Sequence, residues 1–168
     1  MSPVKRIAIS FVALAAAFAA STAFADVQRW TLQDMTFANV TNSLTGQVLS
    51  GGTVTGFFVY DTTKHELVTW NIVTSPGWAT CNVPSAGNVC YTEGIRWTKG
   101  DSHVFTGAAF FQLLQGDQNT LPLLDIFLHQ TTDPNVLALD TRNSAEIESD
   151  SPDTFRHIVT GSATLGTH

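Results

Sequence analysis

The chain has 168 residues, of which 43% are hydrophobic and 13% are charged, and its formal net charge at pH 7 is −6. An acidic balance of this kind attracts neither a phosphate backbone nor an anionic membrane surface, so we expect no nucleic-acid partner. After residue 25 the basic residues are scattered through the sequence and form no local patch: Arg29, Lys64, Arg96, Lys99, Arg142 and Arg156.

The beginning of the chain has the pattern of a secretory signal peptide. Lys5 and Arg6 precede an almost unbroken apolar run over residues 7–20, and the segment ends in the small-x-small sequence Ala-Phe-Ala at Ala25. A positive start, an apolar centre and a small-x-small end are the three parts of a cleavable signal. We therefore expect cleavage after Ala25, a single mature domain over residues 26–168, and a secreted or periplasmic location in a bacterium.

No later segment has the length and apolarity of a membrane helix. The best candidate, residues 121–128, is far shorter than the roughly 20 residues needed and contains Asp125. We expect no integral membrane segment in the mature chain.

The two cysteines, Cys81 and Cys90, lie close together in the sequence. In an exported chain such a pair predicts one local disulfide. A zinc site would need further Cys or His residues near them, and none is present, so we expect neither a metal nor another cofactor.

The mature sequence predicts an all-β domain. Short segments rich in β-branched and aromatic residues alternate with clusters of Gly, Asn, Asp, Pro and Ser, and helical periodicity is absent. The expected strands, in chain order, are residues 29–37, 53–60, 67–75, 94–98, 108–114, 123–130, 145–148 and 155–165. This spacing favours an antiparallel two-sheet β-sandwich, with a closed β-barrel as the alternative.

The second and third expected strands flank a polar connection over residues 61–66 and predict a hairpin. In the third strand Val68, Trp70 and Ile72 share one face, which is the alternation of a strand with one buried side. Asp61 begins the connection, where its carboxylate can accept hydrogen bonds from the following backbone amides in an Asx turn.

Residues 76–94 are expected to form the longest irregular segment, because they combine prolines, glycines and both cysteines. A long loop inside a compact domain is commonly a functional one.

Aromatic residues supply the best candidates for ligand binding. Trp30, Trp70 and Trp97 lie in expected strands and are assigned to the core, whereas Trp78 and Tyr91 lie in the expected loop. Flat aromatic faces can stack on sugar rings, so Trp78 and Tyr91 are the candidate binding residues. The alternative is that Trp78 covers the edge of a sheet.

Acidic residues near the end of the chain allow a second hypothesis. Glu146 and Glu148 share one face of an expected strand, and Asp150 and Asp153 follow. Two carboxyl groups about 5–10 Å apart can hydrolyse a glycosidic bond. Acids with Ser and Pro between them more commonly form a solvated loop, and no Gly-x-Ser-x-Gly motif or similar nucleophile signature occurs. We therefore expect no catalytic residue.

Two stretches resemble a family of small exported bacterial β proteins related to PEP-CTERM-tailed proteins. Residues 52–61 (Gly-Thr-Val-Thr-Gly-Phe-Phe-Val-Tyr-Asp), Thr63 and residues 67–72 (Leu-Val-Thr-Trp-Asn-Ile) are similar to the family's first hairpin. Residues 144–146 and 156–162 are similar to its closing pattern.

The resemblance implies structural roles for the shared residues Gly56, Asp61 and Trp70. The family has no established activity, so no catalytic residue is carried over from it. The chain lacks the Pro-Glu-Pro motif, apolar segment and terminal arginines of the sorting tail, so surface sorting by that route is not expected.

The leading hypothesis is an exported, non-catalytic binding or structural module of the cell envelope or extracellular matrix, with an extracellular glycan as the expected partner. The alternatives are a small secreted hydrolase that uses acids of residues 146–153, and a β-barrel that holds a small apolar ligand.

Overall fold

The computed structural model describes residues 27–100, 102–107, 110–114, 122–150 and 153–166. The expected signal peptide, residues 1–25, lies outside the described residues. The predicted all-β class is confirmed: the described chain contains β-strands and one short 3-10 turn, η1 (Pro84–Ala86). The strands are β1 (Val27–Phe37), β2 (Val40–Thr41), β3 (Val48–Leu49), β4 (Thr53–Asp61), β5 (Glu66–Thr74), β6 (Gly77–Cys81), β7 (Val89–Thr92), β8 (Arg96–Thr98), β9 (His103–Gly107), β10 (Phe110–Leu114), β11 (Leu123–Gln130), β12 (Val136–Leu139), β13 (Ala145–Asp150) and β14 (Asp153–Leu165).

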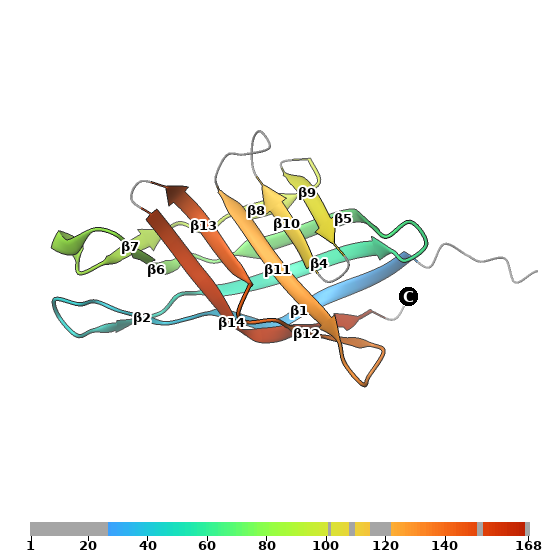
Figure 1. The fold of residues 1–168 in the computed structure, drawn as a ribbon, viewed down its shortest axis with the longest axis horizontal. Coiled ribbons are helices and arrows are strands. Elements are labelled where there is room, and N and C mark those ends of the chain that lie inside the picture. The colour runs from blue at the N-terminus through green and yellow to red at the C-terminus, as the bar shows by residue number, and fades with distance from the viewer. Residues whose placement is uncertain (1–26, 101, 108–109, 115–121, 151–152, 167–168) are drawn as a thin grey trace, which may run out of the picture.

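All strand pairs are antiparallel, and twelve strands form one extended sheet that folds over on itself. Its main path runs β8-β5-β4-β1-β14-β12-β11-β10-β9; β13 pairs with β11 and β14, β6 pairs with β14, and β7 pairs with β6. In Figure 1 the strands β9, β10, β11, β13 and the first part of β14 cross in front of β8, β5, β4 and β1. The two layers make the predicted sandwich. Within the described chain the hydrogen-bonded path ends at β8 and β9 and does not close into a barrel.

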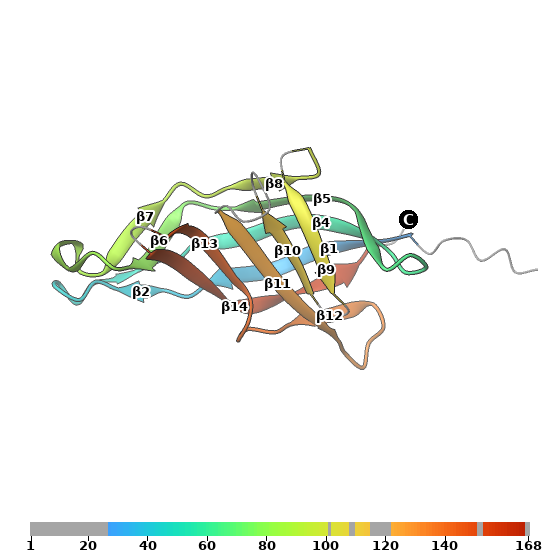
Figure 2. The same ribbon diagram turned by 45° about the horizontal axis from the view of Figure 1, so that its top comes forward.

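The longest strand, β14, belongs to both layers. Its first residues pair with β13 and β6, and its later residues pair with β1 and β12. Gly161 lies where β1 has a bulge, between the pairs Gln33–Ser162 and Thr36–Thr160. It has a φ of +128°, and a Cβ there would come within 2.7 Å of the Met35 Cα. The bend of β14 is visible in Figures 1 and 2.

The core lies between the two layers and follows strand alternation. In β11 the side chains of Leu124, Ile126 and Leu128 are buried, and the residues between them are half-buried. The predicted burial of three tryptophans is also confirmed, because Trp30, Trp70 and Trp97 are at most 5% exposed. Together these residues fill the space between the sheets.

The hairpin of β4 and β5 forms as predicted, with one change of face. The Asp61 carboxylate accepts the backbone N–H groups of Thr63 and Lys64, both at 2.9 Å. The Lys64 amide, more than any other group, lowers the pKa of this carboxyl. Val68 was expected beside Trp70 in the core, but it is the extra residue of a bulge and Leu67 is buried instead.

Residues 76–94 are not irregular, which corrects the sequence-based expectation. They form the hairpin β6–β7, whose strands pair from Gly77–Thr92 to Thr80–Val89. Proline and glycine occur only at its start and in its turn, while its strands hold aromatic and β-branched residues. No helix among the described residues is long and apolar enough to cross a membrane.

Candidate ligand-binding site

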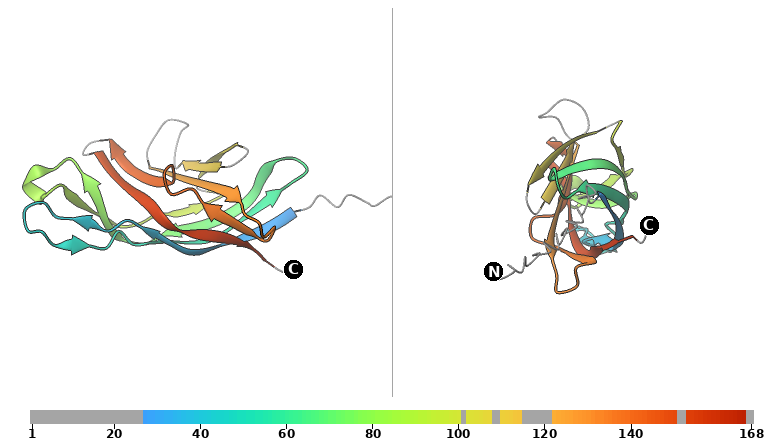
Figure 3. Two further views of the ribbon diagram at one scale, coloured as in Figure 1. Left: turned by 60° about the horizontal axis from the view of Figure 1, so that its bottom comes forward. Right: turned by 90° about the vertical axis from the view of Figure 1, so that its right-hand side faces the viewer.

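Two hairpins extend together beyond one end of the sandwich. One is β2–β3, and the other is β6–β7; we call them the two arms (Figures 1 and 3). Their tips are joined, because the Asn42 side-chain amide donates to the Ala86 carbonyl oxygen at 3.1 Å and the Ser43 N–H donates to the Gly87 carbonyl oxygen at 2.9 Å. Gly87 has a φ of +74°, and a Cβ there would lie 2.2 Å from the Asn42 Oδ1. Glycine is therefore required at this junction.

The β6–β7 arm is held by the predicted disulfide, which the structure confirms. Cys81 and Cys90 are bonded, with their Cα atoms 5.7 Å apart. The bond closes the arm just behind its turn, in which Gly87 donates its N–H to the Pro84 carbonyl oxygen at 3.0 Å. The arm is thus tied covalently at its turn and by hydrogen bonds to the other arm.

Replacing both cysteines with serine should lower the free energy of unfolding by ~2–3 kcal/mol, because the bond closes a small loop in the unfolded chain. Denaturant unfolding of the two forms measures the difference. Equal stability of the Cys81→Ser/Cys90→Ser variant and the parent would contradict a stabilising bond.

The residue register of the β6–β7 arm brings the two predicted binding residues together. Trp78 pairs with Tyr91, and Thr80 pairs with Val89. Opposed residues and alternate residues share one face of an antiparallel pair, so these four side chains project to the same side. Ala79, between Trp78 and Thr80, is fully buried. On the opposite side Tyr91 and Thr80 are exposed and Trp78 is half-buried, whereas Val89 is buried. The side chains of Trp78 and Tyr91 therefore lie on the outer side of the arm.

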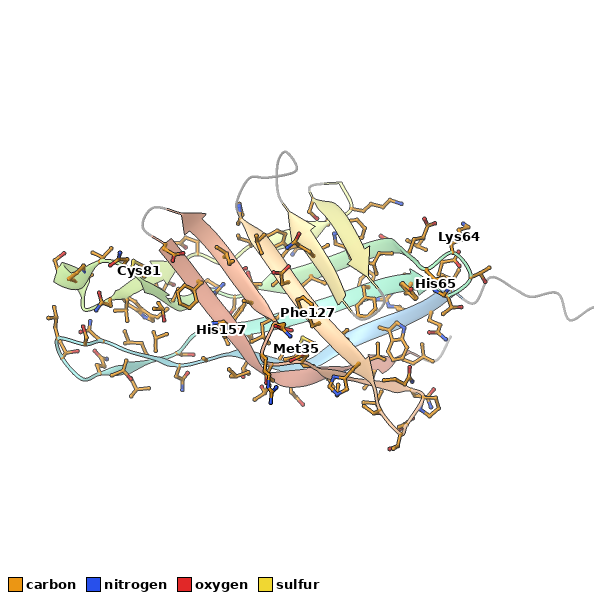
Figure 4. All side chains as sticks on the ribbon, in the orientation of Figure 1. Met35, Lys64, His65, Cys81, Phe127 and His157 are labelled. Atoms are coloured by element: carbon orange, nitrogen blue, oxygen red, sulfur yellow. A yellow bond between two sulfur atoms is a disulfide. The ribbon has the colours of Figure 1, made fainter. Side chains whose placement is uncertain are left out.

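The same outer face continues onto β14. Phe155 pairs with Thr80 of β6, and His157 follows two residues later on the same side. The alternate residues Arg156 and Ile158 are buried. The rings of Phe155 and His157 touch edge to face, with centroids 5.4 Å apart. Figure 4 shows His157 on this strand, near the base of the arms. We call the surface of Trp78, Tyr91, Phe155 and His157 the aromatic face.

Trp78 and Tyr91 form an edge-to-face pair with ring centroids 5.5 Å apart. Tyr91 is 54% exposed, one of the few large apolar side chains left open in the described chain, whereas Trp78 is half-buried. Edge-to-face packing fixes the orientation of both rings. A ligand would therefore meet an exposed ring whose orientation is held by its neighbour.

A groove opens beside the aromatic face where β14 changes its partner. Ala38 donates its N–H to the His157 carbonyl oxygen at 2.8 Å, but Phe155 pairs with Thr80 of β6. The chain after Ala38 turns away from β14 into the β2–β3 arm. The space left between the arms, which we call the interarm groove, has a volume of about 420 Å³ and falls within the range of small-molecule sites.

The interarm groove is lined by amide, hydroxyl and imidazole side chains around an apolar floor, with Arg156 in its wall. Phe155 and Val89 supply apolar surface. The polar lining side chains are Asn39, Thr41, Ser43, Thr80, Asn88 and His157. The sequence did not predict that these residues share one site, because they come together only when the two arms fold against β14.

Glu146 is a buried structural residue, which corrects its expected place in a solvated acidic loop. It is fully buried, lies opposite Arg156 in the β13–β14 register, and forms an ion pair with it. Its second oxygen accepts the Thr74 hydroxyl at 2.6 Å. Both carboxylate oxygens are thus occupied. Asp153 is exposed, and residues 148–152 lie where side chains are not described.

Arg156 extends the ion pair into a network that crosses the sandwich. Its guanidinium donates to the carbonyl oxygens of Gly51 at 2.8 Å and Ser75 at 3.0 Å, and it lies 4.0 Å above the Phe37 ring. The Arg156 guanidinium is therefore bound by groups in the interior, although Arg156 also contributes to the wall of the interarm groove.

Asp125 is a half-buried acid on the outer face of β11. One of its carboxylate oxygens is buried without a hydrogen-bond partner. Burial raises the pKa of this carboxyl, and a hydrogen bond with Gln112 opposes the shift. Among the described residues no three His, Cys, Asp or Glu side chains are grouped as a metal site would require.

Comparison with protein-family models, with curated proteins and with solved structures found no significant match to this chain.

Proposed function

We propose that the protein is an exported, non-catalytic binding module of the cell envelope or extracellular matrix, and that it binds a glycan on the aromatic face. The observation that supports this most strongly is the exposed Tyr91, held edge to face by Trp78 at 5.5 Å beside a groove of polar side chains.

This combination suits a sugar because sugar rings have two kinds of surface. Their C–H faces pack on aromatic rings, whose burial contributes large apolar area at little entropic cost. Their hydroxyl groups need both donors and acceptors, and amide and hydroxyl side chains supply both. The aromatic face offers the first kind of contact, and the interarm groove offers the second.

Three features support export. The first 25 residues have the three parts of a signal peptide. The Cys81–Cys90 disulfide is typical of an oxidising compartment. The resemblance to small exported bacterial β proteins agrees with both.

The two alternatives have less support. A hydrolase that used Glu146 would need an accessible carboxyl group, but this one is fully buried and paired. A barrel with an apolar ligand would need an interior space, whereas Trp30, Trp70 and Trp97 pack between the layers. A purely structural module remains the competing function, and binding measurements separate it from ours.

Electrophoresis through gels that contain dissolved polysaccharides tests the proposal. We expect at least one extracellular polysaccharide to retard the protein, and Tyr91→Ala and Trp78→Ala to reduce the apparent affinity about tenfold or more, as central aromatic contacts do. His65→Asn is the matched control, because His65 is an exposed ring at the opposite end of the molecule (Figure 4). Retardation that is equal in all four proteins would place the ligand elsewhere, and no retardation by any polysaccharide would favour a structural role.

A further inference from the structure

We infer that the interarm groove is the part of the site that selects the ligand, and that it accepts the end of a neutral oligosaccharide. This inference rests on the proposed function, since it names the sugar class and the subsite that reads it.

The interarm groove supplies hydrogen-bonding groups that are not used by other described parts of the protein. Asn39, Thr41 and Thr80 are exposed and make no side-chain hydrogen bond within the described part of the chain, although all three line the groove. Asn88 uses its amide N–H in a long 3.4 Å contact with the Ser43 hydroxyl, which leaves its oxygen as an acceptor. The groove therefore presents several donors and acceptors that protein partners do not occupy.

The charges of the groove lining favour a neutral ligand. Among the described residues, the groove lining contains no carboxylate and no lysine, and the Arg156 guanidinium is bound to Glu146 inside the sandwich. His157 is the other ionisable side chain of this described lining, and it is exposed. An acidic sugar would find no fixed cation here and would approach a protein of net negative charge. A neutral sugar meets neither difficulty.

The shape of the interarm groove favours the end of a sugar chain. The hydrogen bonds of Asn42 and Ser43 to the other arm close the groove at the tips. A chain cannot run along the arms past this junction, so the groove suits a terminal sugar. The next sugar units can then lie on Trp78 and Tyr91, because Trp78 lies about 7 Å along β6 from the groove residue Thr80.

Calorimetric titration with neutral oligosaccharides of increasing length, and with uronate-containing oligosaccharides of the same lengths, tests the inference. The neutral series should bind more tightly than the uronate series. Asn39→Ala should weaken binding about tenfold, and Thr41→Trp, which fills the groove from an exposed position, should weaken it more. Thr132→Trp and Asn135→Ala, exposed in the β11–β12 connection, should bind as the parent does.

The outcomes separate this inference from the proposed function. Binding that depends on Trp78 and Tyr91 but is unchanged in Asn39→Ala and Thr41→Trp would overturn the role of the groove and leave the aromatic face intact. Tighter binding of the uronate series would overturn the inference that the ligand is neutral. Absence of binding by the parent to every oligosaccharide would overturn both proposals together.

Discussion

Replacing Arg156 with methionine should lower the free energy of unfolding by about 3–5 kcal/mol, as expected when one partner of a buried ion pair is removed. The Glu146 carboxylate would stay fully buried without its cation. The carbonyl oxygens of Gly51 and Ser75 would also lose the guanidinium donor. The loss therefore combines an uncompensated charge with unsatisfied acceptors, and each contributes in the same direction.

Urea unfolding at neutral pH measures this loss, and Arg142→Met provides the control. Arg142 is exposed, so its replacement should change the free energy of unfolding by no more than about 0.5 kcal/mol. If Arg156→Met and Arg142→Met unfold at the same urea concentration, the buried network is not what joins β13 and β14 to the rest of the sandwich.

Leu124→Ala should be destabilising by about 2–5 kcal/mol, because it removes a fully buried side chain from between the layers and leaves a cavity. Its neighbour Leu123 lies on the outer face of the same strand and is half-buried. Leu123→Ala removes the same atoms and should cost only about 1 kcal/mol. The pair thus compares one chemical change on the two faces of β11.

Thermal unfolding of the two leucine variants checks this difference. The melting temperature should fall markedly in Leu124→Ala and only slightly in Leu123→Ala. The reverse order would mean that the face carrying Leu123 is the buried one, and it would invert the assignment of the outer face on which the binding site depends.

The parts of the fold that follow from local pattern were predictable from the sequence. The expected strand over residues 123–130 is confirmed as β11, in which Leu124, Ile126 and Leu128 alternate with less buried residues. The Asx turn at Asp61 is also local, because the carboxylate accepts amides only two and three residues ahead. Such features need no knowledge of the distant chain.

The errors arose where partners distant in the sequence decide the structure. The bulge at Val68 exists because β4 and β5 shift their register, which no local pattern shows. Glycine and proline around the β6–β7 arm indicate a loop, yet β14 pairs with Thr80 and the strands form. Glu146 is acidic and near other acids, but the register of β13 and β14 places it opposite Arg156 in the interior.

One part of the candidate site, the aromatic pair, could be predicted from the sequence, and the other part, the interarm groove, could not. Trp78 and Tyr91 were identified from their place in the expected loop over residues 76–94, one on each side of the cysteine pair, and the structure brings their rings together. The interarm groove was not predictable, because Asn39 and Thr41 lie about forty residues before the β6–β7 arm that they face. Only the change of partner along β14 creates the space between them.

The most direct test of the central claim is a tryptophan fluorescence titration of the purified protein with a panel of neutral oligosaccharides and polysaccharides. Trp30, Trp70 and Trp97 are buried, so a ligand on the aromatic face should report through Trp78. We predict a saturable spectral shift with at least one sugar, and the loss of that shift in Trp78→Ala. A shift that persists in Trp78→Ala, or no shift with any sugar, would contradict glycan binding on this face.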